Sequence, residues 1–115
     1  MKIRDLHKIE ALKEITPPED ANRQIVTPYC CDLLSMAMRD AIPDSAWCTV
    51  MNNVNSLAVA SITDVSCIVL CEGATPSEDM IRKAKEMELC IFVTDLSIFQ
   101  AALAIYRLLE PKQFR

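Results

Sequence analysis

The chain has 115 residues, of which 51% are apolar and 24% charged, and this balance is typical of one folded domain over residues 1–115 rather than of a disordered chain. Its formal net charge of −4 disfavours binding to nucleic acids and to anionic membranes, because both attract proteins through their own negative charge. No apolar run approaches the roughly 20 residues that cross a bilayer. The opening residues include Asp5 and Glu10 where a signal peptide needs an apolar stretch, so we expect a cytoplasmic protein.

Residues 1–22 predict a short amphipathic helix followed by a loop. Ile3, Leu6, Ile9 and Leu12 recur at three-residue spacing, which places their side chains on one side of a helix. The prolines and polar residues of 16–22 then interrupt this pattern, as is typical of a loop.

From residue 24 onward, strand patterns and helix patterns alternate. Strands are predicted over 24–29, 46–51, 67–71 and 90–94, and helices over 30–41, 53–64, 75–87 and 95–110, the last ending before Pro111. Such alternation indicates right-handed βαβ units. We therefore predict an α/β fold with a mainly parallel sheet of about four strands and helices on both faces.

Polar residues predict where three of these helices begin. Asn52 or Asn53 can cap the helix over 53–64. Thr75 and Glu78 have the spacing of a capping box. Asp95 or Thr94 can cap the last helix.

The six cysteines predict buried thiols rather than disulfides. They lie within apolar runs, which is typical of a core in a reducing compartment. Only Cys67 and Cys71 approach the spacing of a metal site, and in a strand two residues four apart lie roughly 13 Å from each other. We therefore expect no metal.

Catalytic patterns are equally scarce. His7 is the only histidine and lies far in sequence from the predicted strand ends, so we interpret it as a surface or structurally satisfied side chain. The sequence has no nucleophile elbow and no phosphate loop. Asp32 and Asp64 flank helices and read as helix termini. Cys71, next to Glu72 and ahead of a helix, remains a minor alternative as a nucleophile. We expect no enzymatic activity.

Binding is the more promising interpretation, because ligands of open parallel sheets lie beyond the carboxyl ends of the strands. Three asparagines, at 52, 53 and 55, exceed what one helix end requires, so at least one is free to bind a ligand or a partner backbone. The predicted crevice lies near Tyr29, Asn53, Asn55, Glu72, Gly73 and Ser97. No cofactor can be named from these residues.

Two motifs carry a resemblance to a known family. Tyr-x-x-Asp-Leu-Leu-Ser begins at Tyr29, and Asn-x-x-Ala-Val-Ala begins at Asn55. Together with the segments around them, they make about residues 20–109 resemble the DRTGG-domain family. The chain is similar to the short stand-alone members related to the N-terminal domain of HPr kinase. The resemblance implies a compact α/β domain without kinase activity.

The resemblance also implies a role and partners. In related multidomain proteins a DRTGG domain accompanies nucleotide-sensing CBS modules and contributes to dimer formation. Stand-alone members resemble proteins encoded near hydrogenase and electron-transfer systems of anaerobes. We therefore predict a non-catalytic regulatory or ligand-sensing domain that binds a nucleotide-like small molecule and forms a homodimer. The alternative is a structural interaction module associated with a hydrogenase or redox system.

The chain departs from the family pattern at two places. Thr27 and Pro28 align with the paired glycines of the family motif, which disfavours close approach of an anion there. Asn53 stands where the family usually has a histidine, whereas Asn55 is retained. We therefore expect a neutral, hydrogen-bonding site rather than a titratable one.

Overall fold

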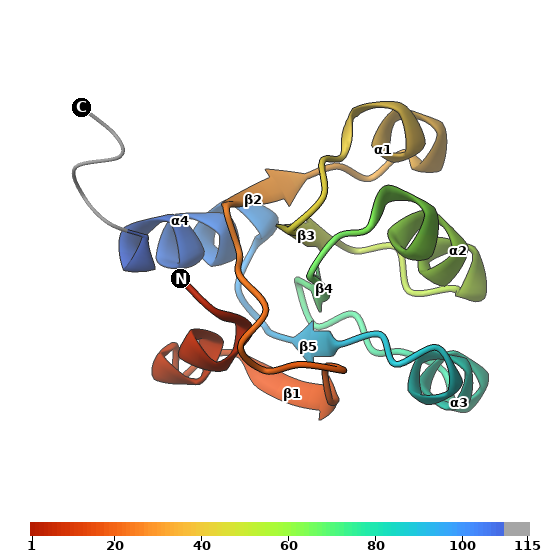
Figure 1. Cartoon of the computed structure of the whole chain (residues 1–115), viewed down its shortest axis with the longest axis horizontal. Coiled ribbons are helices and arrows are strands. Elements are labelled where there is room, and N and C mark those ends of the chain that lie inside the picture. The colour runs from red at the N-terminus through yellow and green to blue at the C-terminus, as the bar shows by residue number, and fades with distance from the viewer. Residues whose placement is uncertain (110–115) are drawn as a thin grey trace.

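The computed structural model describes residues 1–109 and shows a five-stranded sheet with helices on both faces (Figure 1). The strand order is β1-β5-β4-β3-β2. The strands are β1 (Lys13–Thr16), β2 (Thr27–Cys30), β3 (Ser45–Thr49), β4 (Cys67–Leu70) and β5 (Ile91–Val93). The helices are the 3₁₀ helix η1 (Ile3–Lys8) and the α-helices α1 (Leu34–Asp40), α2 (Val54–Thr63), α3 (Glu78–Glu86) and α4 (Ile98–Leu108).

The predicted fold class is confirmed, with one correction to the strand count. β2, β3, β4 and β5 pair in parallel, as the alternation of strands and helices predicts. The fifth strand, β1, pairs antiparallel with β5 at one edge. Its sequence carries the polar residues Lys13 and Glu14, because an edge strand needs only part of its surface buried.

The predicted opening helix is shorter than its apolar spacing indicated. It is a 3₁₀ helix, whose three residues per turn match the spacing of Ile3 and Leu6, and both side chains are buried. Leu12 is buried as well, but from the segment that leads into β1. Thr16 ends that strand beside a β-bulge. Its Oγ1 donates to the carbonyl of Leu89 at 2.7 Å and accepts from the N–H of Ile91 at 2.9 Å.

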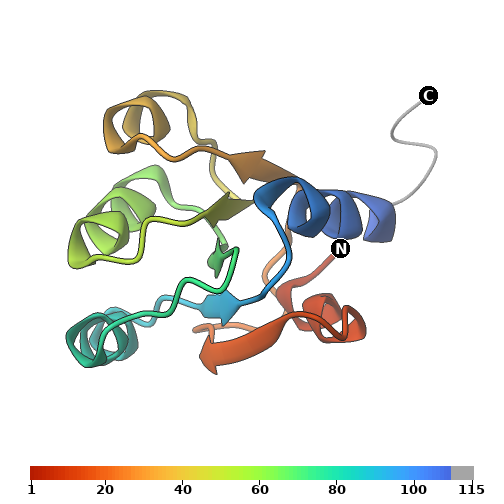
Figure 2. The same ribbon diagram turned by 180° about the vertical axis from the view of Figure 1, so that it is seen from behind.

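Two apolar cores lie on the two faces of the sheet. Seen from behind in Figure 2, α1, α2 and α3 lie on one side, and α4 and the N-terminal segment on the other. Successive residues of β4 serve both cores, since Ile68 packs toward α2 and Val69 toward α4. All four residues of β4 are buried. This confirms the prediction that the apolar run over 67–71 forms a strand covered on both faces.

The helix starts are partly as predicted. Asn53 caps α2, and its Oδ1 accepts from the N–H of Asn55 at 2.9 Å. Ser77, not Thr75, caps α3, because that helix begins only at Glu78. Ser97, not Asp95, caps α4, and it forms a capping box with Gln100.

The element boundaries also shift. The helix predicted over 30–41 begins only at Leu34, because β2 continues through Cys30. Met87, which the apolar spacing of the helix over 75–87 predicts to be buried, is exposed, since α3 ends at Glu86. Pro111, the predicted end of the last helix, lies outside the described residues. Within residues 1–109, no helix has the length and apolar character needed to cross a membrane.

Candidate functional site

The loops that follow β3, β4 and β5 meet at one edge of the sheet, formed by the carboxyl ends of the parallel strands and called the carboxyl edge below. Asn52 joins the first two loops, because its Nδ2 donates to the carbonyl of Thr75 at 2.7 Å. Glu72 joins the second and third, because its N–H donates to the carbonyl of Leu96 at 2.8 Å. These hydrogen bonds hold residues from three loops in one place.

The turn after β4 depends on the one glycine of the chain. Glu72 and Gly73 both have left-handed backbones, with φ angles of 58° and 76°. The N–H of Gly73 donates to the carbonyl of Thr94 at 3.0 Å. A Cβ added at Gly73 would lie 3.5 Å from Oδ1 of Asp95, in a conformation that side chains rarely adopt. The turn therefore brings two successive loops into close contact.

Each of the three asparagines at 52, 53 and 55 has a different role in the structure. Asn52 bridges two loops and Asn53 caps α2. Asn55 is exposed, and its backbone N–H satisfies the cap. In the described part of the chain, no group bonds to the side-chain amide of Asn55. This amide is therefore the one most available to a ligand.

Tyr29 lies apart from the other predicted site residues. It occupies β2 but packs against the core under α1, on the face opposite to α4. Burial raises the pKa of Tyr29 to about 12, and contacts with Cys31 and the carboxylate of Asp40 act in the same direction. The structure thus brings Asn53, Asn55, Glu72, Gly73 and Ser97 to the carboxyl edge and leaves Tyr29 on the α1 side.

Asp32 is a polar residue of this edge whose role differs from the predicted one. It does not cap α1, whose first turn has no side-chain cap. Instead, its Oδ1 accepts from Oγ1 of Thr49 at 2.7 Å and from the N–H of Val50 at 2.9 Å. The carboxylate ties the end of β2 to the end of β3. Asp32 lies two residues after the end of β2, within the helix that the sequence predicts over 30–41.

The comparisons with known proteins agree with this architecture. No family model and no curated protein matches the chain. A solved structure of the CBS and DRTGG domains of the regulatory region of Clostridium perfringens pyrophosphatase, complexed with its activator diadenosine tetraphosphate, superimposes with a TM-score of 0.71 at 15% identity. The match covers 89% of this chain and 44% of that chain. The chain has a DRTGG-like fold.

A small hollow opens at the carboxyl edge of this DRTGG-like fold. It has a volume of about 180 Å³ and is lined by Ala11, Lys13, Gly73, Ala74, Thr75, Val93, Thr94 and Asp95. Pockets that enclose a drug-sized ligand usually measure about 300–1,000 Å³. The hollow therefore fits one part of a larger ligand, whose remainder would lie over the exposed surface.

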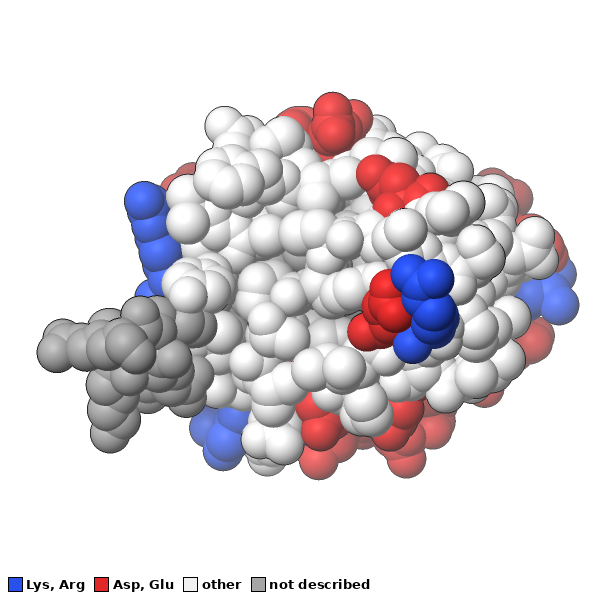
Figure 3. All heavy atoms as spheres, turned by 90° about the horizontal axis from the view of Figure 1, so that it is seen from above, with Lys and Arg blue, Asp and Glu red and all other residues white. Residues whose placement is uncertain are grey.

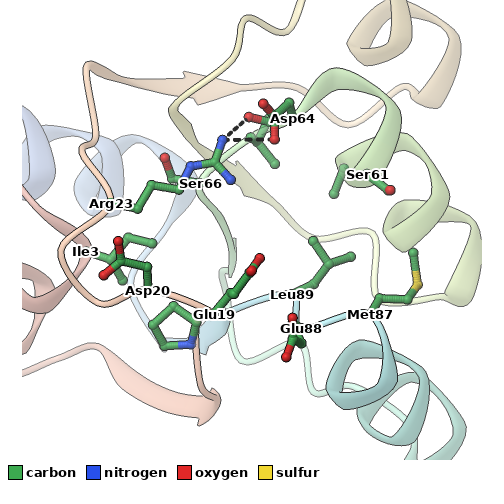
Figure 4. Close-up of a pocket in the computed structure, with 13 residues that line it drawn as sticks. Ile3, Glu19, Asp20, Arg23, Ser61, Asp64, Ser66, Met87, Glu88 and Leu89 are labelled. Carbon is green, nitrogen blue, oxygen red and sulfur yellow. Dashed lines mark hydrogen bonds and ion pairs between the residues drawn. The ribbon is translucent and has the colours of Figure 1, made fainter.

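A second pocket lies at the opposite edge, near the amino ends of β4 and β5 (Figure 4). It has a volume of about 200 Å³, and Arg23 lies among the carboxylates of Glu19, Asp20, Asp64 and Glu88. Nη2 of Arg23 lies 3.0 Å from Oδ1 of Asp64 and also pairs with Asp44. The one arginine that lines this pocket is thus already paired, and the excess of carboxylates around it repels an anion.

The histidine and the cysteines are further reactive groups of the described chain. His7 lies 3.3 Å from the carboxylate of Glu14 and contacts the ring edge of Phe92, as expected for a structurally satisfied side chain. Five cysteines are buried, as predicted, whereas Cys30 is exposed, and all six are free thiols. Among residues 1–109, no three His, Cys, Asp or Glu side chains are placed to hold a metal ion.

Proposed function

We propose that the chain is a non-catalytic regulatory domain that binds a nucleotide-like small molecule at its carboxyl edge. The observation that carries this proposal is the DRTGG-like fold, which it shares with a regulatory region solved in complex with diadenosine tetraphosphate. The exposed amide of Asn55 supports the choice of edge, since no group within residues 1–109 bonds to it.

The chemistry of this edge favours the base of a nucleotide over its phosphates. A side-chain amide both donates and accepts, which matches the edge of a purine. Glu72 and Asp95 lie nearby, and Glu78 and Asp79 occupy the first turn of α3, where they oppose an anion. Lys13 is the one cationic residue among those that line the hollow. We therefore expect phosphorylated ligands to bind as their Mg²⁺ complexes.

A thermal-shift screen tests the proposal on the reduced protein with Mg²⁺ present. The panel contains adenine and guanine mono-, di- and triphosphates, diadenosine tetraphosphate, cyclic dinucleotides, and nicotinamide and flavin cofactors. A ligand that binds only the folded state at 100 times its dissociation constant stabilises that state by about 2.7 kcal/mol. We expect one class to raise the melting temperature in a concentration-dependent way, and Asn55→Ala to abolish that rise.

The matched control is Asn22→Ala, which removes another exposed asparagine from a loop outside the carboxyl edge. It should leave the ligand-dependent rise unchanged. A flat response to the whole panel, or an equal rise in Asn55→Ala, would contradict binding at this edge.

An apolar surface favours self-association as a second property of the domain. Figure 3 views the molecule from the side of α1, β2 and α4, where charged side chains are sparse in the middle of the face. Phe99 of α4 is 71% exposed, and with Pro28, Leu103 and Tyr106 it lines an apolar hollow of about 240 Å³ between α4 and β2. Pro28 lacks an N–H, which disfavours pairing of β2 with another strand, so packing through side chains is the expected mode.

We propose that this surface joins two copies of the chain in a homodimer. Sedimentation velocity should detect the dimer, and Phe99→Ser should raise its dissociation constant by at least about tenfold, because a symmetric interface loses the phenylalanine twice. Ile62→Ser removes an equally exposed apolar side chain from α2 and should have no such effect. A chain that stays monomeric at high concentration would contradict the dimer.

The same surface would serve the alternative function, an interaction module within a hydrogenase or redox-associated assembly. The two functions differ in the ligand screen, because only a sensing domain gains stability from a small molecule. A flat screen together with a stable dimer or a protein partner would favour the interaction module.

A further inference from the structure

Three thiols lie in a row across the sheet near the carboxyl edge. Cys30 ends β2 and is the direct partner of Cys48 in the parallel pairing of β2 with β3. Cys71 follows β4, and its N–H donates to the carbonyl of Thr49 at 2.9 Å. Cys48 and Cys71 belong to the core on the α4 side of the sheet. Since paired residues on adjacent strands point to the same face, Cys30 lies on that side too.

The three thiols differ in their access to solvent. All six cysteines fall within residues 1–109, and of these Cys30 alone is exposed. Cys48 has no exposed surface, and neither has Cys71. A reagent in solution therefore meets Cys30 first, and Cys48 lies at the paired position on the neighbouring strand.

Hydrogen bonding distinguishes the exposed thiol from its neighbours. A hydrogen bond from Cys48 lowers the pKa of Cys30 to about 7 and raises the pKa of Cys48 well above its usual range. A hydrogen bond with Cys48 also lowers the pKa of Cys71, but Cys71 has no exposed surface and cannot meet a reagent in solution. Near neutral pH, Cys30 is therefore partly a thiolate, which is the nucleophilic form of cysteine.

We propose that Cys30 and Cys48 form a thiol–disulfide exchange site that reacts with low-molecular-weight disulfides, with Cys30 as the attacking thiol and Cys48 as the resolving thiol. Adjacent strands lie about 4.7–4.9 Å apart, and disulfides join Cα atoms that lie about 4.4–6.8 Å apart. The paired positions therefore satisfy the first requirement for a bond. Cys30 is also the last residue of β2, where the backbone can adjust.

The exchange proceeds in two balanced steps. The Cys30 thiolate attacks one sulfur of the small disulfide, whose S–S bond breaks, and the other half leaves as a thiolate that takes up a proton. Cys48 then loses its proton to solvent and attacks the Cys30 sulfur, which expels the second half of the reagent. The protein loses two hydrogens and gains one S–S bond, and the small disulfide is reduced to two thiols.

Such a bond would change the surroundings of the candidate ligand site. It would join β2 to β3 one residue before the place where Asp32 accepts hydrogen bonds from Thr49 and Val50. Oxidation of the two thiols and binding of a ligand would thereby both affect the carboxyl ends of β2 and β3. This site stands independently of the proposed ligand, because its chemistry needs only the two thiols.

Oxidation of the full chain with glutathione disulfide at neutral pH tests the proposal, at a protein concentration where sedimentation shows a monomer. Peptide mapping by mass spectrometry without reduction should find a Cys30–Cys48 disulfide in the wild-type chain. Cys48→Ser should stop at a glutathione adduct on Cys30, and Cys30→Ser should react at least about tenfold more slowly. Cys31→Ser, which removes a buried thiol on the opposite face, should react as the wild type does.

Other results would overturn the proposal. A wild-type chain without the Cys30–Cys48 bond contradicts it directly, and this measurement needs no variant that could fail to fold. A bond between Cys30 and Cys31, lost in Cys31→Ser, would also contradict it. So would alkylation of Cys30 by iodoacetamide with a midpoint near pH 8.5, the ordinary value for a thiol, instead of near 7.

Discussion

Replacing Trp47 with alanine should lower the free energy of unfolding by about 3–5 kcal/mol, as large-to-small changes of buried aromatic residues usually do. Trp47 is fully buried in the core between the sheet and the helices α1 and α2. Its Nε1–H also donates to the carbonyl of Cys31 at 3.0 Å. Urea unfolding followed by circular dichroism measures the change, since the variant loses the only tryptophan of the chain.

Trp47→Phe separates the two contributions of this residue. It keeps most of the apolar volume but leaves the carbonyl of Cys31 without its donor, which costs about 1–3 kcal/mol. We therefore expect Trp47→Phe to fall between the wild type and Trp47→Ala. A loss below about 1 kcal/mol for Trp47→Ala would contradict the packing of this core.

Replacing Arg23 with methionine should lower the free energy of unfolding by about 1–3 kcal/mol. Its Nε donates to Oδ1 of Asp44 at 3.1 Å, and its Nη2 contacts the carboxylate and the carbonyl of Asp64. Asp44 and Asp64 both have left-handed backbones, and the N–H of Asp44 donates to the carbonyl of Asp64 at 3.0 Å. Because the Arg23 side chain is 30% exposed, water screens part of the attraction, and we expect a loss near the lower end of this range.

Arg82→Met provides the control for Arg23→Met. Arg82 pairs with Asp79 one turn earlier on α3, and both side chains are largely exposed. Such pairs usually contribute less than about 0.5 kcal/mol. Equal losses for the two variants in chemical denaturation would contradict a stabilising role for the bonds from Arg23 to Asp44 and Asp64.

The architecture could be predicted because its signals are local. The apolar run over 67–71 predicts a strand buried on both faces, and alternation with helices predicts parallel pairing. The DRTGG resemblance is confirmed at the level of the fold by a structural match at 15% identity. Asn53 caps α2 as predicted, because capping depends on residues next to one another in the chain.

The errors arise where pairing between distant segments decides the outcome. β1 has a polar sequence, and only its pairing with β5 about 75 residues later makes it a strand. Tyr29 faces α1 because alternate residues of β2 point to opposite faces, and the register of β2 on β3 decides which residues those are. The same register places Cys30 next to Cys48, which spacing along the chain does not indicate.

The candidate site shows the same division. The rule for parallel sheets selects the carboxyl edge, and five of the six predicted residues lie there. The sequence could not distribute roles among the asparagines, since the bond from Asn52 to Thr75 joins two separate loops. The sequence places Asp32 at a helix terminus and does not reveal its partners, because Thr49 and Val50 lie in another strand and the loop after it.

The most direct test of ligand binding at the carboxyl edge is a nuclear magnetic resonance titration of the ¹⁵N-labelled chain with the Mg²⁺ complexes of the nucleotides in the screen. We expect the side-chain amide of Asn55 and the backbone amides of Asn53 and Gly73 to shift, while Ser61 and Glu88 in the opposite pocket remain unchanged. Shifts centred on Ser61 and Glu88, or no shift at any residue, would contradict the proposal.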